Sequence, residues 1–220
     1  MLRSTRWPST ARPHGSLAHS YLFLRRAIGL IGVALPVVLI VGKVLLDGGG
    51  PLDSISDYYY SGMRNVFVGS MVATGVFLLS YRGYGLVDDV TSDAAGVGAI
   101  GVGLFPTTPF FGVPTRTDRL VGWAHLASAA LFFAGLIVFC LFLFTRSIGP
   151  RTRRKVNRNA VYVASGLTMI VVLVLAGLVQ AVFHAGVGPP HWVLWLESTA
   201  VEAFGVAWLV KGTTILADER

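Results

Sequence analysis

Apolar runs of about 20 residues recur along this chain, and they constrain its fold more than any other feature. The first extends from Ala27 to Leu46, which is long enough for an α-helix to cross the hydrocarbon core of a bilayer. Hydrophobic residues make up 54% of the chain and charged residues only 13%, whereas soluble domains carry about 25% charged residues. The sequence therefore predicts an all-α fold, a polytopic membrane helical bundle.

Six transmembrane helices are expected, separated by polar or Gly- and Pro-rich segments. The expected spans cover residues 27–46, 62–81, 94–111, 120–145, 160–183 and 192–211. Pro106 and Pro109 interrupt the third, which predicts a short helix followed by an extended segment. Residues 1–26 lack apolar periodicity, so we expect a disordered basic tail, followed by a membrane domain over 27–215 and a short tail over 216–220.

The basic residues are distributed unevenly between the two sides of the expected bundle. The formal net charge is +7, and most Lys and Arg residues fall within 3–26, 146–158 and other segments on one side. The opposite side holds only Arg64, Arg116 and Arg119, with Lys43 near a helix end. Because cytoplasmic loops carry the excess of Lys and Arg, both termini are expected to be cytoplasmic. This pattern explains the positive charge without nucleic acid, which we do not expect as a partner.

Polar residues gather in the half of the bundle that is expected to face outward. The candidate ligand-binding residues are Ser56, Asp57, Arg64, His125 and Glu197. Arg64 is placed at a helix N-terminus, where the helix macrodipole disfavours a cation, so an anion is expected beside it. That anion is either Asp53 or Asp57 in an ion pair, or the phosphate of a lipid.

Glu202 is an ionisable residue near the middle of the last expected span. Such a group costs several kcal/mol in lipid unless it is protonated or paired, so it is either hydrogen-bonded to a neighbouring helix or part of a site. His191, Trp195, Ser198 and Glu202 follow one another at spacings of 4, 3 and 4, which predicts that they face a common neighbour. A proton-coupled transporter using Glu202 is one alternative function.

The histidines could in principle bind zinc, but their spacing does not form a recognised motif. The weak candidates are His125, His184 and His191, and no pair shows HxxxH or HExxH spacing. The chain contains neither a GxSxG elbow nor a P-loop, and its single cysteine, Cys140, forms no CxxC pair. We therefore expect no metal and no cofactor, and a metal-dependent lipid hydrolase using these histidines is a second alternative.

Three short motifs resemble a known family. They are Ile55-Ser-Asp57, His125 followed by Leu-Ala-Ser-Ala-Ala, and His191 with Trp195-Leu-Glu197, and they are similar to motifs of the six-helix Frag1/DRAM/Sfk1 membrane proteins, in particular a bacterial branch. Members of that family are implicated in lipid handling, so the resemblance implies a lipid-related role for Ser56, Asp57, His125 and Glu197. The chain departs from the family after Asp57, where three tyrosines replace a small polar turn.

The predicted function is to bind or organise lipid through a polar pocket at the outer leaflet, and the motifs favour a protein that is not an enzyme. Membrane lipids are the expected partners, and a homo-oligomer is compatible with the sequence. The expected location is the plasma membrane, as a multi-pass protein of the bacterial inner membrane.

Overall fold

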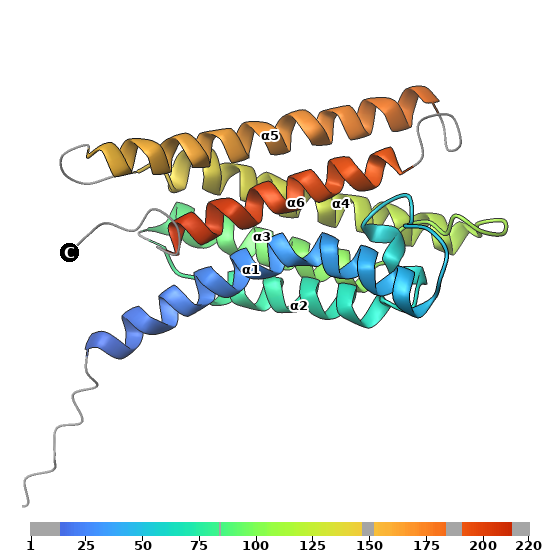
Figure 1. Ribbon diagram of the computed structural model, residues 1–220, viewed down its shortest axis with the longest axis horizontal. Helices are drawn as coiled ribbons and strands as arrows, with labels where there is room; N and C mark the ends of the chain where they lie inside the picture. The colour runs from blue at the N-terminus through green and yellow to red at the C-terminus, as the bar shows by residue number, and fades with distance from the viewer. Residues whose placement is uncertain (1–13, 84, 147–151, 184–190, 213–220) are drawn as a thin grey trace, which may run out of the picture.

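The computed structural model describes residues 14–83, 85–146, 152–183 and 191–212, and these residues form a bundle of long helices (Figure 1). The helices are α1 (His14–Leu46), α2 (Arg64–Ser80), α3 (Leu86–Leu104), α4 (Arg116–Val138), α5 (Arg153–Phe183) and α6 (Trp192–Lys211). A 3₁₀ helix, η1 (Ser56–Tyr60), precedes α2, and a π-helical turn, η2 (Phe139–Leu143), continues α4. The described residues contain no strand, which confirms the all-α prediction.

Four helices begin earlier than the sequence patterns indicated, and among them α4 begins at Arg116 rather than at residue 120 and α5 at Arg153 rather than at residue 160. Helix α1 begins at His14 rather than at residue 27, and α3 begins at Leu86 rather than at residue 94. In α3, Asp88 and Asp89 occupy the first turn, where the positive end of the helix dipole stabilises carboxylates. Helix α3 ends at Leu104, because Pro106 lacks an N–H group and cannot continue the hydrogen-bonding pattern. Helix α6 has the predicted bounds.

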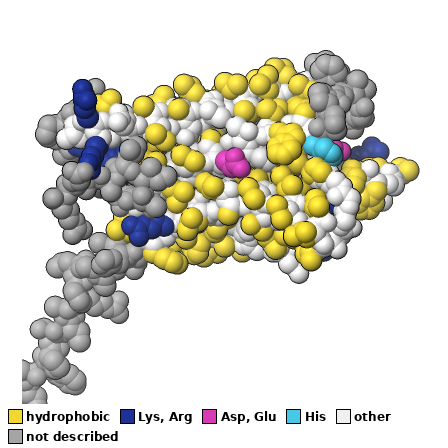
Figure 2. Space-filling view, in the orientation of Figure 1, with side chains coloured by type: hydrophobic (Ala, Val, Ile, Leu, Met, Phe, Trp, Pro, Cys, Tyr) yellow, Lys and Arg dark blue, Asp and Glu magenta, His cyan; other side chains and the backbone are white. Residues whose placement is uncertain are grey.

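Four of the described helical segments are long and apolar enough to cross a membrane. These are Leu22–Leu46, Arg116–Leu143, Arg153–Val179 and Trp192–Lys211. Helix α2 is apolar but has only 17 residues. Hydrophobic side chains cover the middle of the face seen in Figure 2, with one acidic group among them and basic groups towards the two ends. This distribution is typical of a helical membrane protein.

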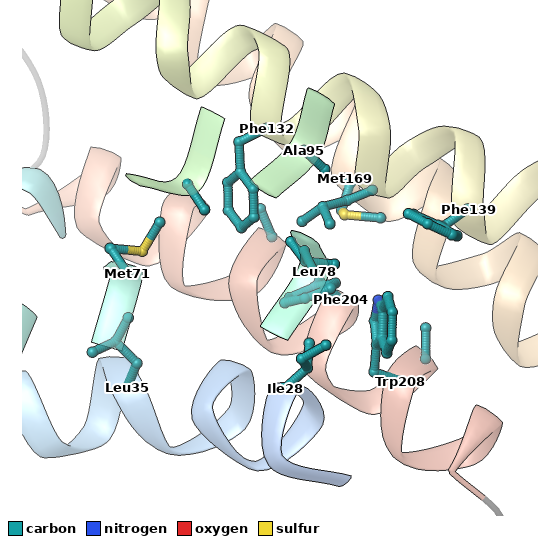
Figure 3. Packing of buried hydrophobic residues seen from close by; sticks show 14 of the residues in the cluster. Ile28, Leu35, Met71, Leu78, Ala95, Phe132, Phe139, Met169, Phe204 and Trp208 are labelled. Atoms are coloured by element: carbon teal, nitrogen blue, oxygen red, sulfur yellow. The ribbon is translucent and has the colours of Figure 1, made fainter. Parts of the chain in front are cut away.

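The helices pack as two layers of three. Helices α1, α6 and α5 lie side by side in one layer, and α2, α3 and α4 form the other (Figure 1). The layers are joined less extensively at the α1–α2 and α4–α5 seams. Large side chains fill the space between the layers, including the fully buried Leu78, Phe204 and Trp208 (Figure 3).

Glycines allow very close backbone contact within a layer. A Cβ atom added at Gly205 of α6 would lie 2.6 Å from the backbone nitrogen of Val33 and 2.8 Å from the carbonyl oxygen of Gly29 in α1. A side chain at this position would force the two helices apart. Small residues at such crossings are a common means of helix association in membranes, where the hydrophobic effect does not drive helices together.

We expect Gly205→Ala to separate α1 from α6 and to lower the free energy of unfolding by about 1–3 kcal/mol, the typical cost of overpacking. Unfolding in mixed micelles, followed by circular dichroism, measures the change. Gly177→Ala in α5 is the matched control, because no heavy atom outside its own surroundings lies within 4 Å of the added Cβ. Equal effects of the two substitutions would contradict the close α1–α6 contact.

Candidate functional site

The loop before α2 is fastened to the start of α6 by reciprocal hydrogen bonds. The backbone N–H of Leu194, in the first turn of α6, donates to the carbonyl oxygen of Asp53 at 2.8 Å. In return, the backbone N–H of Ile55 donates to Oε2 of Glu197 at 2.8 Å, and the backbone N–H of Ser56 also faces this carboxylate. N–H groups in the first turn of a helix have no acceptor within the helix. The loop therefore supplies an acceptor to an N–H group of α6, and α6 supplies an acceptor to N–H groups of the loop.

His125 fastens the same loop to the end of α3. Its ring is buried, with Nδ1 2.7 Å from the carbonyl oxygen of Phe105 and Nε2 3.0 Å from Oγ of Ser56. A carbonyl can only accept, so Nδ1 carries a proton, and in the neutral ring Nε2 then accepts from the Ser56 hydroxyl. Phe105 immediately follows α3, where carbonyl groups lack partners within the helix.

We call Asp53, Ile55, Ser56, His125 and Glu197 the η1 clamp, because these residues hold the loop around η1 against α3, α4 and α6. Asp57 lies beside the clamp, where its backbone N–H donates to Oγ of Ser54 at 3.0 Å. Burial raises the pKa of Asp57 above its ordinary value of 3.8, and the nearby Asp53 carboxylate acts in the same direction. The Asp57 and Glu197 carboxylates are also near enough to repel each other.

Arg64 lies outside the clamp. Its guanidinium donates to the hydroxyl of Tyr59, and its Cζ lies 4.2 Å from the centroid of the Tyr59 ring. The predicted ion pair with Asp53 or Asp57 is therefore wrong. Asp53 instead faces His191, with 3.0 Å between Oδ1 and Nδ1. Because Arg64 is exposed and has no carboxylate partner among the described residues, its charge is available to an anion.

The residues predicted to form a stripe on α6 are not all buried against one neighbour. Trp195 is 55% exposed, whereas Ser198, three residues further on, is only 5% exposed. Glu202 is partly exposed and makes no hydrogen bond or ion pair with any described residue. The expected hydrogen bond from Glu202 to a neighbouring helix is therefore not seen.

The candidate metal ligands do not converge in the described part of the chain. No three His, Cys, Asp or Glu residues lie together there in an arrangement that could hold a metal ion. His125 is engaged by Phe105 and Ser56, and His191 faces Asp53. His184 lies outside the described residues, so its contribution is not tested.

Two open hollows lie at the α1–α2 seam and are lined mainly by apolar residues. One has a volume of about 250 Å³ and the other about 420 Å³. Both are lined by Val38 and Val66, so they form one groove along the two helices, which we call the α1–α2 groove. Ser70 is the only residue with a polar side chain among those that line it. The groove is apolar, unlike the polar pocket that the sequence predicted.

Sequence reasoning found the side chains of the clamp but missed the backbone groups that they bind. Proline at position 106 was the available signal, because it ends α3 and leaves carbonyl groups at the end of that helix for His125 to bond. The bond from Leu194 to Asp53 had no comparable signal.

No protein-family model, no curated protein and no solved structure matches this chain. The resemblance to the Frag1/DRAM/Sfk1 family therefore stays a prediction. The site has to be interpreted from its own geometry.

Removal of the Glu197 carboxylate should weaken the clamp. We expect Glu197→Ala to lower the free energy of unfolding by about 1–3 kcal/mol, because it leaves backbone N–H groups without an acceptor. Glu197→Gln should lose less, because the amide oxygen can still accept from Ile55. Denaturant unfolding in micelles measures both, and Glu202→Gln is the control at a carboxyl without a described partner. A loss in the control as large as in Glu197→Ala would argue against the clamp.

Asp57 should make stability depend on pH in a defined direction. Because burial raises its pKa in the folded state, the folded protein binds the proton more tightly than the unfolded chain. Stability should therefore fall as the pH rises from about 4 through the folded-state pKa. Thermal unfolding at a series of pH values should show a shallower fall for Asp57→Asn than for the wild-type protein. Parallel curves would show that Asp57 does not carry this dependence.

Proposed function

We propose that this protein spans the plasma membrane six times, with both termini in the cytoplasm, and binds a phospholipid in the leaflet at the η1 end of the bundle. The acyl chain lies in the α1–α2 groove, and the phosphate contacts Arg64. The single observation that carries the proposal is the apolar groove at an open seam, beside a cation that has no carboxylate partner among the described residues.

The groove suits an acyl chain in both chemistry and position. Its walls are formed by residues such as Val37, Val41 and Leu46, whose side chains are exposed rather than packed in the core. It reaches Gly62 and Met63, which immediately precede Arg64, so one end of the groove lies near the start of α2. A hydrocarbon chain along these walls would have apolar surface on both sides.

Two cations follow residues of the groove directly in the sequence. Lys43 adjoins the groove residue Gly42, and its Nζ donates to the carbonyl oxygen of Gly48 at 2.6 Å. Arg64 follows Met63 and is held over the Tyr59 ring, which leaves its outward N–H groups for an anion. A phosphate accepts well from a guanidinium, because several of its oxygens can bond to the planar N–H fork at once.

In this proposal the η1 clamp positions the site rather than contacting the lipid. His125 contacts the Ser56 hydroxyl and the carbonyl group at the end of α3, and Glu197 accepts from the backbone of the loop. These bonds fix the loop that carries Tyr59. The resemblance to a family implicated in lipid handling supports the same general role.

A serine-dependent lipid hydrolase is the second candidate, because Ser56 Oγ lies 3.0 Å from His125 Nε2. In such enzymes the histidine activates the serine, and nearby N–H groups stabilise the oxyanion. Here the N–H groups of Ile55 and Ser56 face Glu197, and that of Asp57 bonds to Ser54. The site therefore favours binding over hydrolysis.

Loss of the Arg64 charge should reduce lipid retention. We expect Arg64→Ala to retain about tenfold less phospholipid than the wild-type protein, as befits the loss of a charge-assisted contact. Native mass spectrometry of the protein purified in a mild detergent counts the bound lipid. Arg116→Ala is the matched control, because Arg116 is an exposed arginine at the same end of the bundle.

Glu202→Gln should leave lipid retention unchanged, because Glu202 does not line the groove. If Arg64→Ala and Arg116→Ala lost equal amounts of bound phospholipid, the loss would be an effect of surface charge in general, and the assignment of the site to Arg64 would be wrong. Release of fatty acid that stops in Ser56→Ala would favour the hydrolase instead.

A further inference from the structure

Helix α6 carries an acidic residue in the middle of a segment that is long and apolar enough to cross a membrane. The helix has 20 residues, so its length of about 30 Å matches the hydrocarbon core of a bilayer. Glu202 lies midway between Trp192 and Lys211, which places it roughly 13–15 Å from either end of the helix. A glutamate side chain is too short to cover that distance, so its carboxyl group cannot reach the aqueous surface along the helix.

Glu202 belongs to a stripe of residues on the outward face of α6. The exposed residues of this helix are Trp195, Thr199 and Val206, and the partly exposed Glu202 completes their series at spacings of 4, 3 and 4. Residues at these spacings lie on one face of a helix. Figure 2, drawn in the orientation of Figure 1, shows an acidic group in the middle of the apolar surface over α6. We call these four residues the Glu202 stripe.

The neighbouring helices of the same layer offer no charge to Glu202. Helices α1 and α5 lie on either side of α6, and residues 27–42 of α1 and 160–179 of α5 contain no Lys, Arg, His, Asp or Glu. Glu202 also makes no hydrogen bond or ion pair with any described residue. A carboxyl group at this depth is costly unless it is protonated or paired, and such groups normally face a partner rather than lipid.

We propose that a second copy of this chain covers the Glu202 stripe, and that the two Glu202 side chains hydrogen-bond to each other across the interface. A protonated carboxyl group has both a donor and an acceptor, so two of them satisfy each other without any further group. Hydrocarbon chains have neither, so lipid on this face would leave the carboxyl group without a partner. The chemistry of the stripe is therefore complementary to itself.

Symmetry brings the two carboxyl groups to the same place. Two copies inserted in the membrane with the same orientation are related by a twofold axis along the membrane normal, so each residue lies at the same depth as its own copy. Because α6 is the central helix of its layer (Figure 1), the Glu202 stripe lies near this axis when the two layers face each other. The Thr199 hydroxyl needs no partner there, because it donates to the carbonyl oxygen of Trp195 at 2.8 Å.

This inference does not rest on the lipid site proposed at Arg64. No residue of the Glu202 stripe lines the α1–α2 groove. Failure of the lipid site would therefore leave the dimer standing, and the reverse is also true.

The test measures dimerisation of the full chain in a bilayer. Copies labelled at the amino terminus with a donor or an acceptor fluorophore are mixed in dioleoylphosphatidylcholine vesicles, and energy transfer is followed as the protein-to-lipid ratio falls. We expect the wild-type protein to dimerise, and Glu202→Leu to need an about tenfold higher ratio for the same dimer fraction, because it loses the interhelical hydrogen bonds. Glu202→Gln should dimerise as the wild-type protein does, because an amide also has a donor and an acceptor.

Two results of this measurement would contradict the proposal. If the wild-type protein stays monomeric at every ratio, lipid or a different membrane protein covers the stripe. If Glu202→Leu dimerises as readily as the wild-type protein, the carboxyl groups do not hold the two copies together.

Disulfide formation locates the interface independently of Glu202. Thr199→Cys and Val206→Cys each place a thiol about one turn from Glu202 on the stripe. Both should form disulfide-linked dimers when they are oxidised in vesicles with copper phenanthroline, since two cysteines are bridged only when their Cα atoms come within about 7 Å. The wild-type protein is the blank, because its single cysteine, Cys140, is buried.

Leu131→Cys is the matched control, because Leu131 is exposed on α4 in the other layer. It lies six residues after His125, as Glu202 lies five residues after Glu197, and both His125 and Glu197 contact the loop around η1. The two positions are therefore at similar depth. Disulfide-linked dimers of Leu131→Cys in the same yield as those of Val206→Cys would show random collision and would overturn the assigned interface.

Discussion

The structure depends on hydrogen-bond partners for the backbone N–H and C=O groups at helix ends that lie close to the apolar region of the bundle. Helix α3 stops at Leu104 and α6 starts at Trp192, and each end leaves N–H or C=O groups without partners inside the helix. At the η1 end these groups are bonded by His125 and by the carbonyl of Asp53, while Glu197 satisfies the loop in return. The polar residues that gather at this end therefore have a structural role, which is to complete the hydrogen bonding of the helix ends and of the loop.

This structural role explains why the η1 clamp, although polar, is not the proposed binding site. Hydrogen bonds that are already made inside the protein must be broken before the same groups can bind a ligand, so a fully bonded cluster is a poor receptor. Arg64 differs from the clamp in this respect, because it rests on the Tyr59 ring and has no carboxylate partner among the described residues. Aromatic support for a charge without a carboxylate partner among the described residues is the feature on which the proposed lipid site depends.

The sequence predicted the class of fold and the convergence of Ser56, His125 and Glu197, because spans and their order decide which loops share an end. It failed where the outcome depends on loop conformation. An exposed arginine such as Arg64 can reach a carboxylate or a ring equally well, and only the path of the loop through η1 selects Tyr59. It also failed at the start of α3, where acidic residues were interpreted as a loop although they stabilise a first helical turn.

The glycine crossings have a mechanical consequence for the bundle. Where backbones touch, as at Gly205, there is no deformable side chain between the helices, so each layer of three resists bending and spreading. The α1–α2 seam is instead lined by longer side chains, among them the flexible Met63. Lateral pressure from the surrounding bilayer would therefore be absorbed mainly across the seam, and a thicker or more crowded membrane would narrow the groove before it disturbed either layer.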